Sequence, residues 1–229
     1  MPVRKKASED LTAKKALALE VIRRLKAEYP DAGCTLDYDH AWQLLVSVRL
    51  AAQCTDARVN IVVEELFAKY PSVAALAAAE PEDIEAIVKP CGLGHSKARD
   101  ISACMRMLRD KYDCRVPDTF EALLALPGVG RKSANLIMGD VFGKPAIVTD
   151  THCIRLCNKI GLVDGIKEPQ KVEMALWKII PPEEGSDLCH RFVMHGRAVC
   201  NARKPECEKC CLKDICRAAR EAAGQQAEP

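Results

Sequence analysis

The spacing of apolar residues is the feature that most constrains the fold of this 229-residue chain. Apolar residues recur three and four positions apart almost throughout, as with Leu17, Val21, Ile22 and Leu25, and this spacing places them on one face of a helix. Runs that alternate apolar and polar residues, as half-buried strands do, are scarce. The pattern therefore predicts an all-α fold.

Proline and glycine divide this pattern into about ten short helices, because both residues interrupt a helix. The segment 41–52, AWQLLVSVRLAA, is apolar on nearly every face, which predicts a helix buried on all sides at the centre of a bundle. Residues 146–149 could pass for a strand, but so short and isolated a run is better interpreted as a connector. The breakers are Pro30 with Gly33, Pro71, Pro81, Pro90 to Gly94, Pro117, Pro127 to Gly130, Gly143 with Pro145, and Pro181 with Pro182.

Composition limits the class of protein. The net charge is only +2, so the whole-chain balance neither requires nor excludes a nucleic-acid partner. No apolar run reaches the length of about 18 residues that a membrane span needs, and the first ten residues lack the apolar core of a secretory signal. The thirteen cysteines favour a reducing compartment, where clustered thiols more often bind metal than form disulfides. We expect a protein of the cytoplasm, or of the nucleus in a eukaryote, with no membrane association.

Four of the cysteines form a ligand-like pattern near the C-terminus. Cys200, Cys207, Cys210 and Cys216 follow the spacing C-x6-C-x2-C-x5-C, so four thiolates could close on one metal centre within a compact loop. Cys211 lies outside this pattern and is interpreted as a bystander. The chemistry of four cysteine ligands does not by itself distinguish a structural zinc from an iron-sulfur cluster. A set of unrelated buried thiols is the third interpretation.

The segment 126–137, LPGVGRKSANLI, predicts a tight hairpin between two helices. Asp118 and Glu121 stand at capping-box spacing at the start of the first helix. Gly128 and Gly130 permit positive φ and close backbone approach, and the amides that open the second helix would form an anion site. Such a hairpin can hold phosphates without reading sequence, although taken alone a purely structural turn is the more common explanation.

These motifs together resemble the endonuclease III family of helix-hairpin-helix DNA glycosylase/AP lyases. The resemblance lies in GVGRKSAN, in VTDTHCIRLCNKIG that follows it, and in the cysteine spacing, and it covers roughly residues 15 to 217. It implies a bifunctional base excision repair enzyme acting on damaged double-stranded DNA, oxidised pyrimidines above all. It also implies a 4Fe-4S cluster on the four cysteines.

The resemblance assigns the nucleophile to Lys132, which follows the Gly-Val-Gly-Arg turn, and an assisting carboxylate to Asp150. An amine that attacks C1′ becomes a Schiff base, which promotes β-elimination of the 3′ phosphate. The amine must be unprotonated, and the positive end of a helix dipole disfavours an ammonium. Asp150 would accept a proton and stabilise the cationic sugar. Each residue taken alone would more often be a solvated charge.

The resemblance also implies DNA contacts. Gln53 and Leu93 would fill the gap left by an extruded base, although a glutamine near a helix end and a leucine beside glycine are commonplace. Independently of the resemblance, the positive charge of Lys97 and Arg99 predicts either phosphate contacts or a solvated helix face. The same two interpretations hold for the cysteine-loop residues Arg203, Lys204 and Lys209. His152 is interpreted as an orienting or packing group. The hairpin contacts would come from Leu126, Gly128, Val129, Gly130 and Arg131.

The expected architecture has a six-helix barrel over residues 34–144 and a cluster-bearing domain of residues 1–33 and 145–217, with DNA and the catalytic pair between them, and residues 218–229 as a flexible tail. We expect a monomer. Two other functions stay open. One is the related adenine-removing mismatch glycosylase, although it carries a Glu where this chain has Val48 and it lacks the nucleophilic Lys. The other is a non-catalytic DNA-binding module with a structural zinc.

Overall fold

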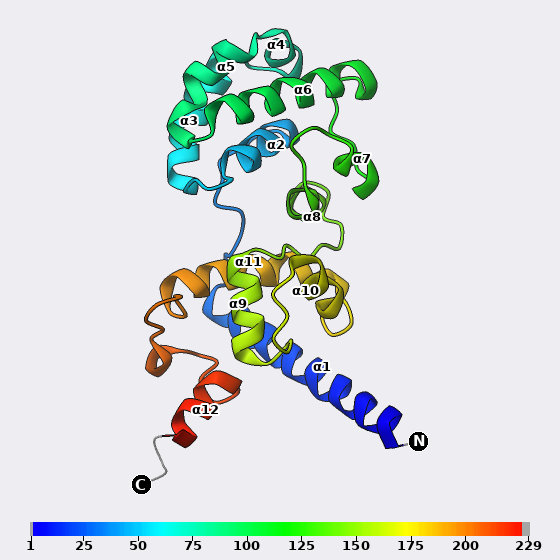
Figure 1. Cartoon of the computed structure of the whole chain (residues 1–229), viewed down its shortest axis with the longest axis vertical. Helices are drawn as coiled ribbons and strands as arrows, with labels where there is room; N and C mark the ends of the chain where they lie inside the picture. Colours follow the sequence, from blue (N-terminus) through cyan, green and yellow to red (C-terminus); the bar gives the residue numbers. More distant parts are fainter. Residues whose placement is uncertain (1, 226–229) are drawn as a thin grey trace. The chain divides into compact units, whose positions relative to one another are not determined.

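The structure is a computed structural model that describes residues 2–225, and it divides into two compact units. The central unit is Cys34–Gly143, and the terminal unit combines Met1–Gly33 with Lys144–Pro229. Every regular element in the described part of the chain is helical, which confirms the all-α prediction (Figure 1). Residues 146–149 form no strand, as expected from their short length.

The central unit is built around α2 and α6. Its helices are α2 (Ala41–Leu50), α3 (Asp56–Lys69), α4 (Val73–Ala78), α5 (Pro81–Val88), the short 3-10 helix η1 (Lys89–Cys91), α6 (Gly94–Tyr112), α7 (Phe120–Leu124) and α8 (Arg131–Asp140). Helix α6 packs against α4, α5 and α2.

Helix α2 carries the most densely buried stretch of the central unit. Trp42 to Ser47 and Leu50 are all buried, which confirms the prediction of a helix enclosed by its neighbours. Trp42 contacts the ring of Phe67 edge to face at 5.1 Å between ring centroids. Leu108 and Met105 on α6 are fully buried in the same core. The core therefore fixes the end of α2, shortly before Gln53, and the start of α6, directly after Leu93.

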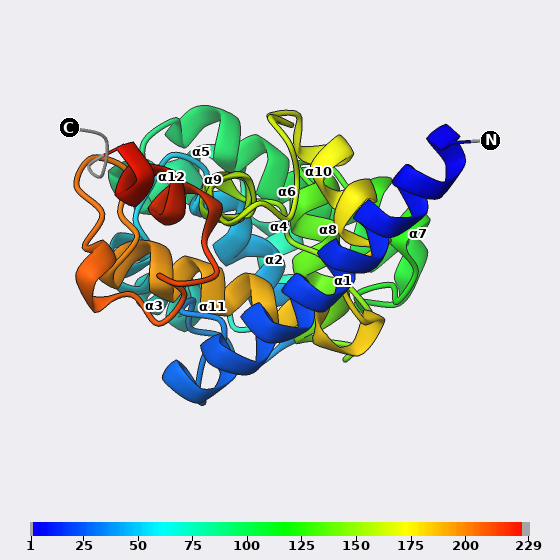
Figure 2. The same cartoon turned by 90° about the horizontal axis from the view of Figure 1, so that it is seen from below.

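The terminal unit brings the two ends of the chain together. Its helices are α1 (Pro2–Glu28), α9 (Thr151–Ile160), α10 (Pro169–Leu176), η2 (Pro182–Glu184), α11 (Gly185–Ala198), η3 (Cys207–Lys209) and α12 (Arg217–Gln225). Helix α11 packs against both α1 and α9 (Figures 1 and 2). The buried face of α1, Ala18, Val21, Ile22 and Leu25, holds the predicted helical spacing.

Two local features differ from the sequence expectation. Residues 217–225 form helix α12 where a tail without regular structure was expected, because four alanines in RAAREAAGQ favour a helix. Residues 226–229 lie outside the described residues. The predicted capping box at Asp118 was wrong: the N-cap of α7 is Thr119, whose hydroxyl accepts a hydrogen bond from the Ala122 amide at 3.4 Å. A threonine in extended conformation directly before the helix serves as the cap.

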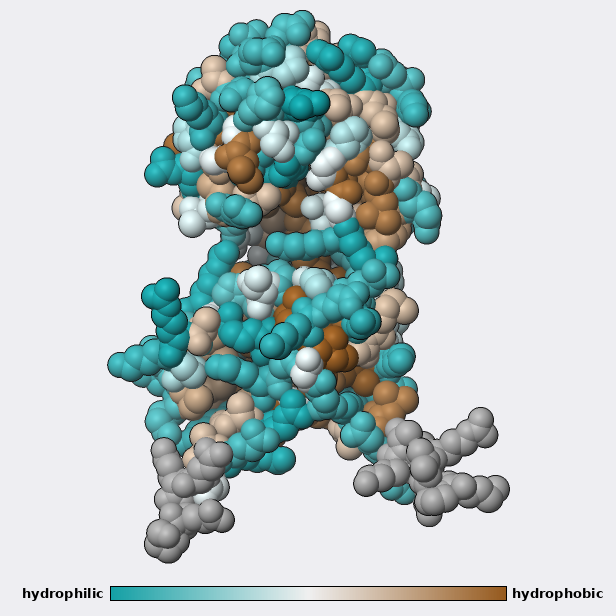
Figure 3. Space-filling model, viewed as in Figure 1, coloured by the Kyte–Doolittle hydropathy of each residue, from teal (hydrophilic) through white to brown (hydrophobic). Residues whose placement is uncertain are grey.

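The face of the molecule drawn in Figure 3 is mostly hydrophilic, in keeping with cores that enclose most of the large apolar side chains. In the described part of the chain no helix combines the length and apolar character that crossing a membrane requires.

Candidate active site

A tight turn joins α7 to α8. The Val129 amide donates to the Leu126 carbonyl at 3.2 Å, with Pro127 and Gly128 between them. Gly128 has a φ of +74°, the conformation that a type II turn requires at its third residue. Pro127 supplies the fixed φ that the second residue needs. The glycine and proline of the sequence motif thus build this turn, as predicted.

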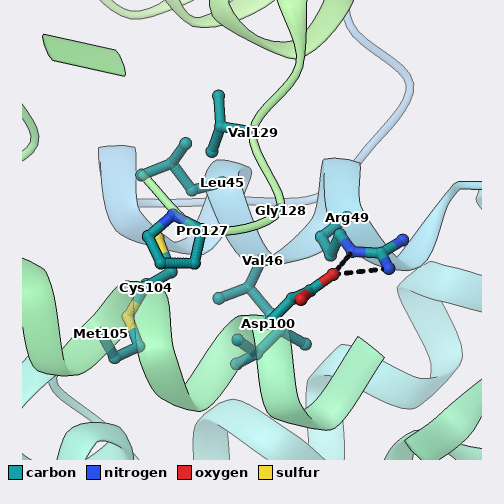
Figure 4. A pocket seen from close by; sticks show the side chains of 10 residues that line it. Leu45, Val46, Arg49, Asp100, Cys104, Met105, Pro127, Gly128 and Val129 are labelled. Atoms are coloured by element: carbon teal, nitrogen blue, oxygen red, sulfur yellow. Dashed lines mark hydrogen bonds and ion pairs between the residues drawn. The ribbon is translucent and has the colours of Figure 1, made fainter. Parts of the chain in front are cut away.

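The turn lies against an ion pair between α2 and α6 (Figure 4). Arg49 Nε donates to Asp100 Oδ2 at 2.7 Å, and a second guanidinium nitrogen donates to Ser96 Oγ at 3.1 Å. A Cβ added at Gly128 would lie 2.9 Å from Asp100 Cβ and 3.1 Å from Arg49 Cδ. Gly128 is therefore required both by its backbone conformation and by this close approach.

The Arg49–Asp100 pair was not predicted from the sequence. Arg49 is a charged residue in an otherwise apolar helix, which was an available signal, but its partner Asp100 lies 51 positions away. The same residues line a small pocket with Leu45, Val46, Ile101, Cys104, Met105, Pro127, Gly128 and Val129.

The other residues of the hairpin differ in how far they are exposed to solvent. Leu126 is only 2% exposed and belongs to the core, so it anchors the hairpin. Val129 is half-buried and Gly130 is exposed. The Arg131 guanidinium lies over the Phe120 ring, 4.9 Å from its centroid. Gly130 is the N-cap of α8 and, having no side chain, provides no side-chain cap for the first amides of the helix.

Lys132 is the second residue of α8, and its side chain is exposed. Its neighbours Ala134 and Asn135 are buried, which fixes the helix face from which the amine projects. The positive end of the α8 dipole lies at this first turn. Lys132 belongs to the central unit.

Asp150 belongs to the terminal unit, where it is the N-cap of α9. Its Oδ1 accepts a hydrogen bond from the Cys153 amide at 2.7 Å, and the side chain is half-exposed. The Val148 amide donates to Cys189 Sγ at 3.2 Å, which holds the segment leading into Asp150. The cap uses one carboxylate oxygen, so Oδ2 takes no part in it.

Buried thiols lie beneath Asp150. Cys153 Sγ and Cys157 Sγ are 3.9 Å apart, and both residues are fully buried. The hydrogen bond with Cys157, followed by burial, raises the pKa of Cys153 well above 9.0. The hydrogen bond with Cys153, followed by burial, does the same for the pKa of Cys189. Cys153 and Cys189 therefore stay neutral and add no charge beside the carboxylate.

Gln53 and Leu93 share an unusual backbone conformation. Gln53 has a φ of +57° in the turn after α2, and Leu93 has a φ of +52° at the N-cap of α6. The Leu93 side chain is 58% exposed, and Gln53 is exposed. Non-glycine residues in this region are uncommon and cost on the order of 1–3 kcal/mol, so the surrounding structure must hold them there.

Lys97 does not face solvent, so both predictions for it, a phosphate contact and a solvated helix face, were wrong. Its side chain is 0% exposed, and Nζ donates to the Leu50 carbonyl at 2.7 Å and to the Cys91 carbonyl at 2.8 Å. Burial lowers its pKa below 10.5. Arg99, two residues on, is exposed as expected for a solvated face or a phosphate contact.

The four cysteines of the pattern follow α11 in the terminal unit. Cys200, Cys210 and Cys216 are half-buried and Cys207 is exposed. Cys200 lies close enough to each of the other three for electrostatic interaction. The Leu212 amide donates to Cys210 Sγ at 3.4 Å. Burial raises the pKa of Cys200, and nearby Lys159 and Arg155 oppose that rise. Four sulfur donors with an amide and cations near them fit a thiolate-bound group, although among residues 2–225 no three potential ligands are close enough to hold a single metal ion.

Arg155 links the first turn of α9 to the end of α11 and the start of the cysteine loop. Its guanidinium donates to the Cys200 carbonyl at 2.7 Å and to the Gly196 carbonyl at 3.2 Å, and it contacts His152 Nδ1 at 3.2 Å. A Cβ at Gly196 would lie 2.3 Å from His152 Nδ1, so the His152 ring packs directly on α11. The segment that begins at Asp150 is thus fixed to the start of the cysteine loop.

The chain is similar to known DNA-repair proteins over most of its length. A family model described as the HhH-GPD superfamily base excision DNA repair protein matches residues 46–182. Endonuclease III of Synechocystis sp. is 42% identical over 207 residues, which are 90% of this chain and 94% of that protein. The chain belongs to the endonuclease III family. The Escherichia coli K12 endonuclease III is 38% identical over 202 residues, with 88% of this chain and 95% of that protein covered.

The endonuclease III fold extends over nearly the whole chain. A solved structure of a trapped covalent intermediate of endonuclease III with DNA matches with a TM-score of 0.86 at 39% identity, covering 91% of this chain and 98% of that one. As an endonuclease III family member the chain is a base excision repair DNA glycosylase with AP lyase activity. The comparisons favour neither the adenine mismatch glycosylase nor the non-catalytic zinc module.

Proposed function

We propose that this enzyme removes oxidised pyrimidines from double-stranded DNA and cleaves the resulting abasic site, with Lys132 as the nucleophile. The observation that carries the proposal is the exposed amine of Lys132 in the first turn of α8, directly after a hairpin whose amides have no side-chain cap. A phosphate held by those amides would bring the adjacent sugar within reach of the same helix turn. We propose that one chain acts as a monomer.

The Lys132 Nζ would attack C1′ of the damaged nucleotide and displace the base as the leaving group. The amine nitrogen loses its protons as a C1′ imine forms and the sugar ring opens. Loss of a C2′ proton then expels the 3′ phosphate, breaking the C3′–O bond by β-elimination. Hydrolysis of the imine returns the free lysine. Desolvation under bound DNA and the α8 dipole both favour the neutral amine that the first step needs.

Asp150 would act on the same sugar through Oδ2. Oδ1 is held by the Cys153 amide, which fixes the orientation of the carboxylate. A carboxylate in this position accepts the proton that the amine releases and stabilises positive charge on the sugar as the base departs. The neutral thiols beneath it leave Asp150 as the local negative charge of the α9 N-terminus.

We propose that Gln53 and Leu93 occupy the space vacated by the extruded nucleotide. Both are exposed and both extend from left-handed positions at helix ends of the central unit. The hairpin would bind the DNA backbone through the amides near Gly128, Gly130 and Arg131, which makes this grip independent of sequence.

Cys200, Cys207, Cys210 and Cys216 would hold a 4Fe-4S cluster. When bound, the cluster would cross-link the loop after α11 through four thiolates and order it. Arg203, Lys204 and Lys209 on this loop are exposed, and we propose that they rest against phosphates.

A lesion panel tests the proposed substrate class. Single-turnover base release would be measured on otherwise identical duplexes that carry an oxidised pyrimidine, an alkylated purine, adenine opposite an oxidised guanine, or no lesion. The proposal expects the oxidised pyrimidine to react fastest, with strand cleavage following base release. Faster release of adenine or of the alkylated purine would contradict the proposed substrate class. Strand cleavage of a duplex with a pre-formed abasic site tests the lyase activity separately.

A further inference from the structure

We infer that Lys97 is a positioning residue that sets Gln53 and Leu93 in register with each other. The inference rests on the proposed gap-filling role of those two residues. The Lys97 ammonium donates to neither of them, although the Lys97 backbone amide donates to the Leu93 carbonyl at 3.0 Å in the first turn of α6. It acts through the backbone carbonyls at the ends of the two segments that lead into them.

The Lys97 ammonium hydrogen-bonds to two segments that are far apart in the sequence, each at the end of a helix. The Leu50 carbonyl ends α2, three residues before Gln53, and the Cys91 carbonyl ends η1, two residues before Leu93. Both carbonyls belong to helix termini, where the last C=O groups have no partner within the helix. One buried ammonium therefore satisfies two such groups and fixes the spacing between the two turns.

A buried lysine is costly unless it is well hydrogen-bonded, and a leucine or methionine would fill the same core position without that cost. The presence of a buried ammonium at Lys97 therefore requires an explanation. Gln53 and Leu93, which both have a left-handed backbone conformation, provide one. Gln53 and Leu93 hold strained conformations that persist only where the surroundings impose them. Lys97 is the connection between the two strained turns.

The neighbouring residues of α6 reinforce the same end of α2. Ser96 and Asp100 bind Arg49, the residue before Leu50, and that ion pair supports Gly128 of the hairpin. The first turns of α6 thus contact the end of α2 through two cations. Arg49 faces the hairpin, and Lys97 faces the turns that carry the gap-filling residues.

The test compares Lys97→Met with Leu108→Ala in the full-length protein. Met has a similar length and no donors, so it removes both carbonyl contacts. Leu108 is fully buried on the same helix, and shortening it lowers stability without touching either turn. Both variants would be assayed below their unfolding temperatures on a duplex with an oxidised pyrimidine and on an abasic site in single-stranded DNA, where no gap in a duplex has to be filled.

Lys97→Met is expected to slow base release from the duplex by on the order of tenfold to a hundredfold, because a small displacement of positioning groups is enough for such a loss. Cleavage of the single-stranded abasic site should stay near the wild-type rate, and Leu108→Ala should keep both rates. Lys97→Gln, a shorter neutral donor, is expected to show the same selective loss at smaller size and serves if the Met variant does not fold. Equal effects of Lys97→Met and Leu108→Ala on both substrates would overturn the inference.

A DNA-free measurement separates this inference from the proposed function. In amide NMR spectra, Lys97→Met should shift the signals of residues 51–54 and 91–93 more than the rest of the central unit. If those shifts appear while Gln53→Ala and Leu93→Ala release bases normally, the gap-filling role fails and the positioning by Lys97 stands. If the signals of the two turns do not move, Lys97 does not position them.

Discussion

At the scale of single residues, Asp150 combines a structural contact with the proposed chemistry, and one substitution separates the two. Asn is as good an N-cap as Asp, so Asp150→Asn should keep the bond from the Cys153 amide and change the free energy of unfolding by no more than about 0.5 kcal/mol. Base release should fall on the order of 10²-fold, because the amide neither accepts the proton nor carries charge. Urea unfolding and single-turnover base release check both parts. A variant that lost stability and kept activity would contradict this division of roles.

Two glycines of the hairpin form a matched pair of test positions. Gly128→Ala should lower the free energy of unfolding by about 1–3 kcal/mol, because Gly128 has a φ of +74° and its new Cβ would lie 2.9 Å from Asp100 Cβ. Gly130→Ala should cost less, no more than about 1 kcal/mol for a poorer N-cap, since Gly130 is extended and a Cβ there meets nothing within 4 Å. Thermal unfolding of both variants provides the measurement. Equal melting temperatures would show that the Arg49–Asp100 pair does not constrain the turn.

Sequence motifs located some site residues and missed others for a physical reason. The hairpin residues could be predicted because their roles depend on local conformation, which neighbouring residues determine. Lys97 could not, because a lysine beside an exposed leucine gives no indication that its amine ends 0% exposed against carbonyls 47 and 6 positions away. The roles of Lys132 and Asp150 came from the family resemblance and stay predictions.

At the scale of elements, helix α1 is an integral part of the terminal unit. Leu25 is 0% exposed on its inner face, while Leu19 on the same helix is 53% exposed. Arg191 of α11 donates to the Tyr29 carbonyl at 3.2 Å, just beyond the end of α1. The N-terminal segment thus docks on α11 through both apolar packing and a buried guanidinium.

This docking predicts different costs for two leucine truncations. Leu25→Ala should lower the free energy of unfolding by roughly 2–5 kcal/mol, whereas Leu19→Ala should change it by no more than about 0.5 kcal/mol. Chemical denaturation of each variant measures the difference. Similar small effects at both positions would mean that α1 is not anchored to α11.

Element boundaries were predictable where proline interrupts or begins a helix. Pro71 lies between the end of α3 and the start of α4, and Pro81 is the first residue of α5. They were less predictable where two capping residues stand side by side. Asp118 and Thr119 are both good N-caps, and the choice of Thr119 depends on where the rest of α7 packs, which the local sequence does not contain.

At the scale of the whole molecule, the division into two units places Lys132 in one and Asp150 in the other. The all-α class followed from periodicity, because that signal is repeated along the entire chain. The Arg49–Asp100 pair and the contact of Cys189 with the segment before Asp150 could not be predicted from the sequence. Both depend on contacts between elements that are distant in sequence.

Two cysteines of the same loop, one inside and one outside the proposed ligand set, provide a test of the proposed cluster. Cys207→Ser should reduce the iron bound per chain and weaken the broad absorbance near about 400 nm expected of a cysteinyl cluster. Cys211→Ser should retain both, because the Cys211 backbone carbonyl still accepts from Arg24 at 2.9 Å and its thiol is outside the ligand set. Iron analysis and absorbance spectra compare the two variants. Equal iron loss in both, or one zinc per chain in the unaltered protein, would refute this assignment.

The most direct test of the account is covalent trapping at Lys132. Borohydride added during turnover reduces an imine between protein and DNA to a stable adduct, and only a primary amine can form that imine. Lys132→Gln should abolish the adduct and strand cleavage while duplex binding through the hairpin survives. Lys111→Gln, which removes another exposed lysine of the central unit, should trap at the wild-type rate. An adduct formed by Lys132→Gln at the wild-type rate would show that another amine is the nucleophile.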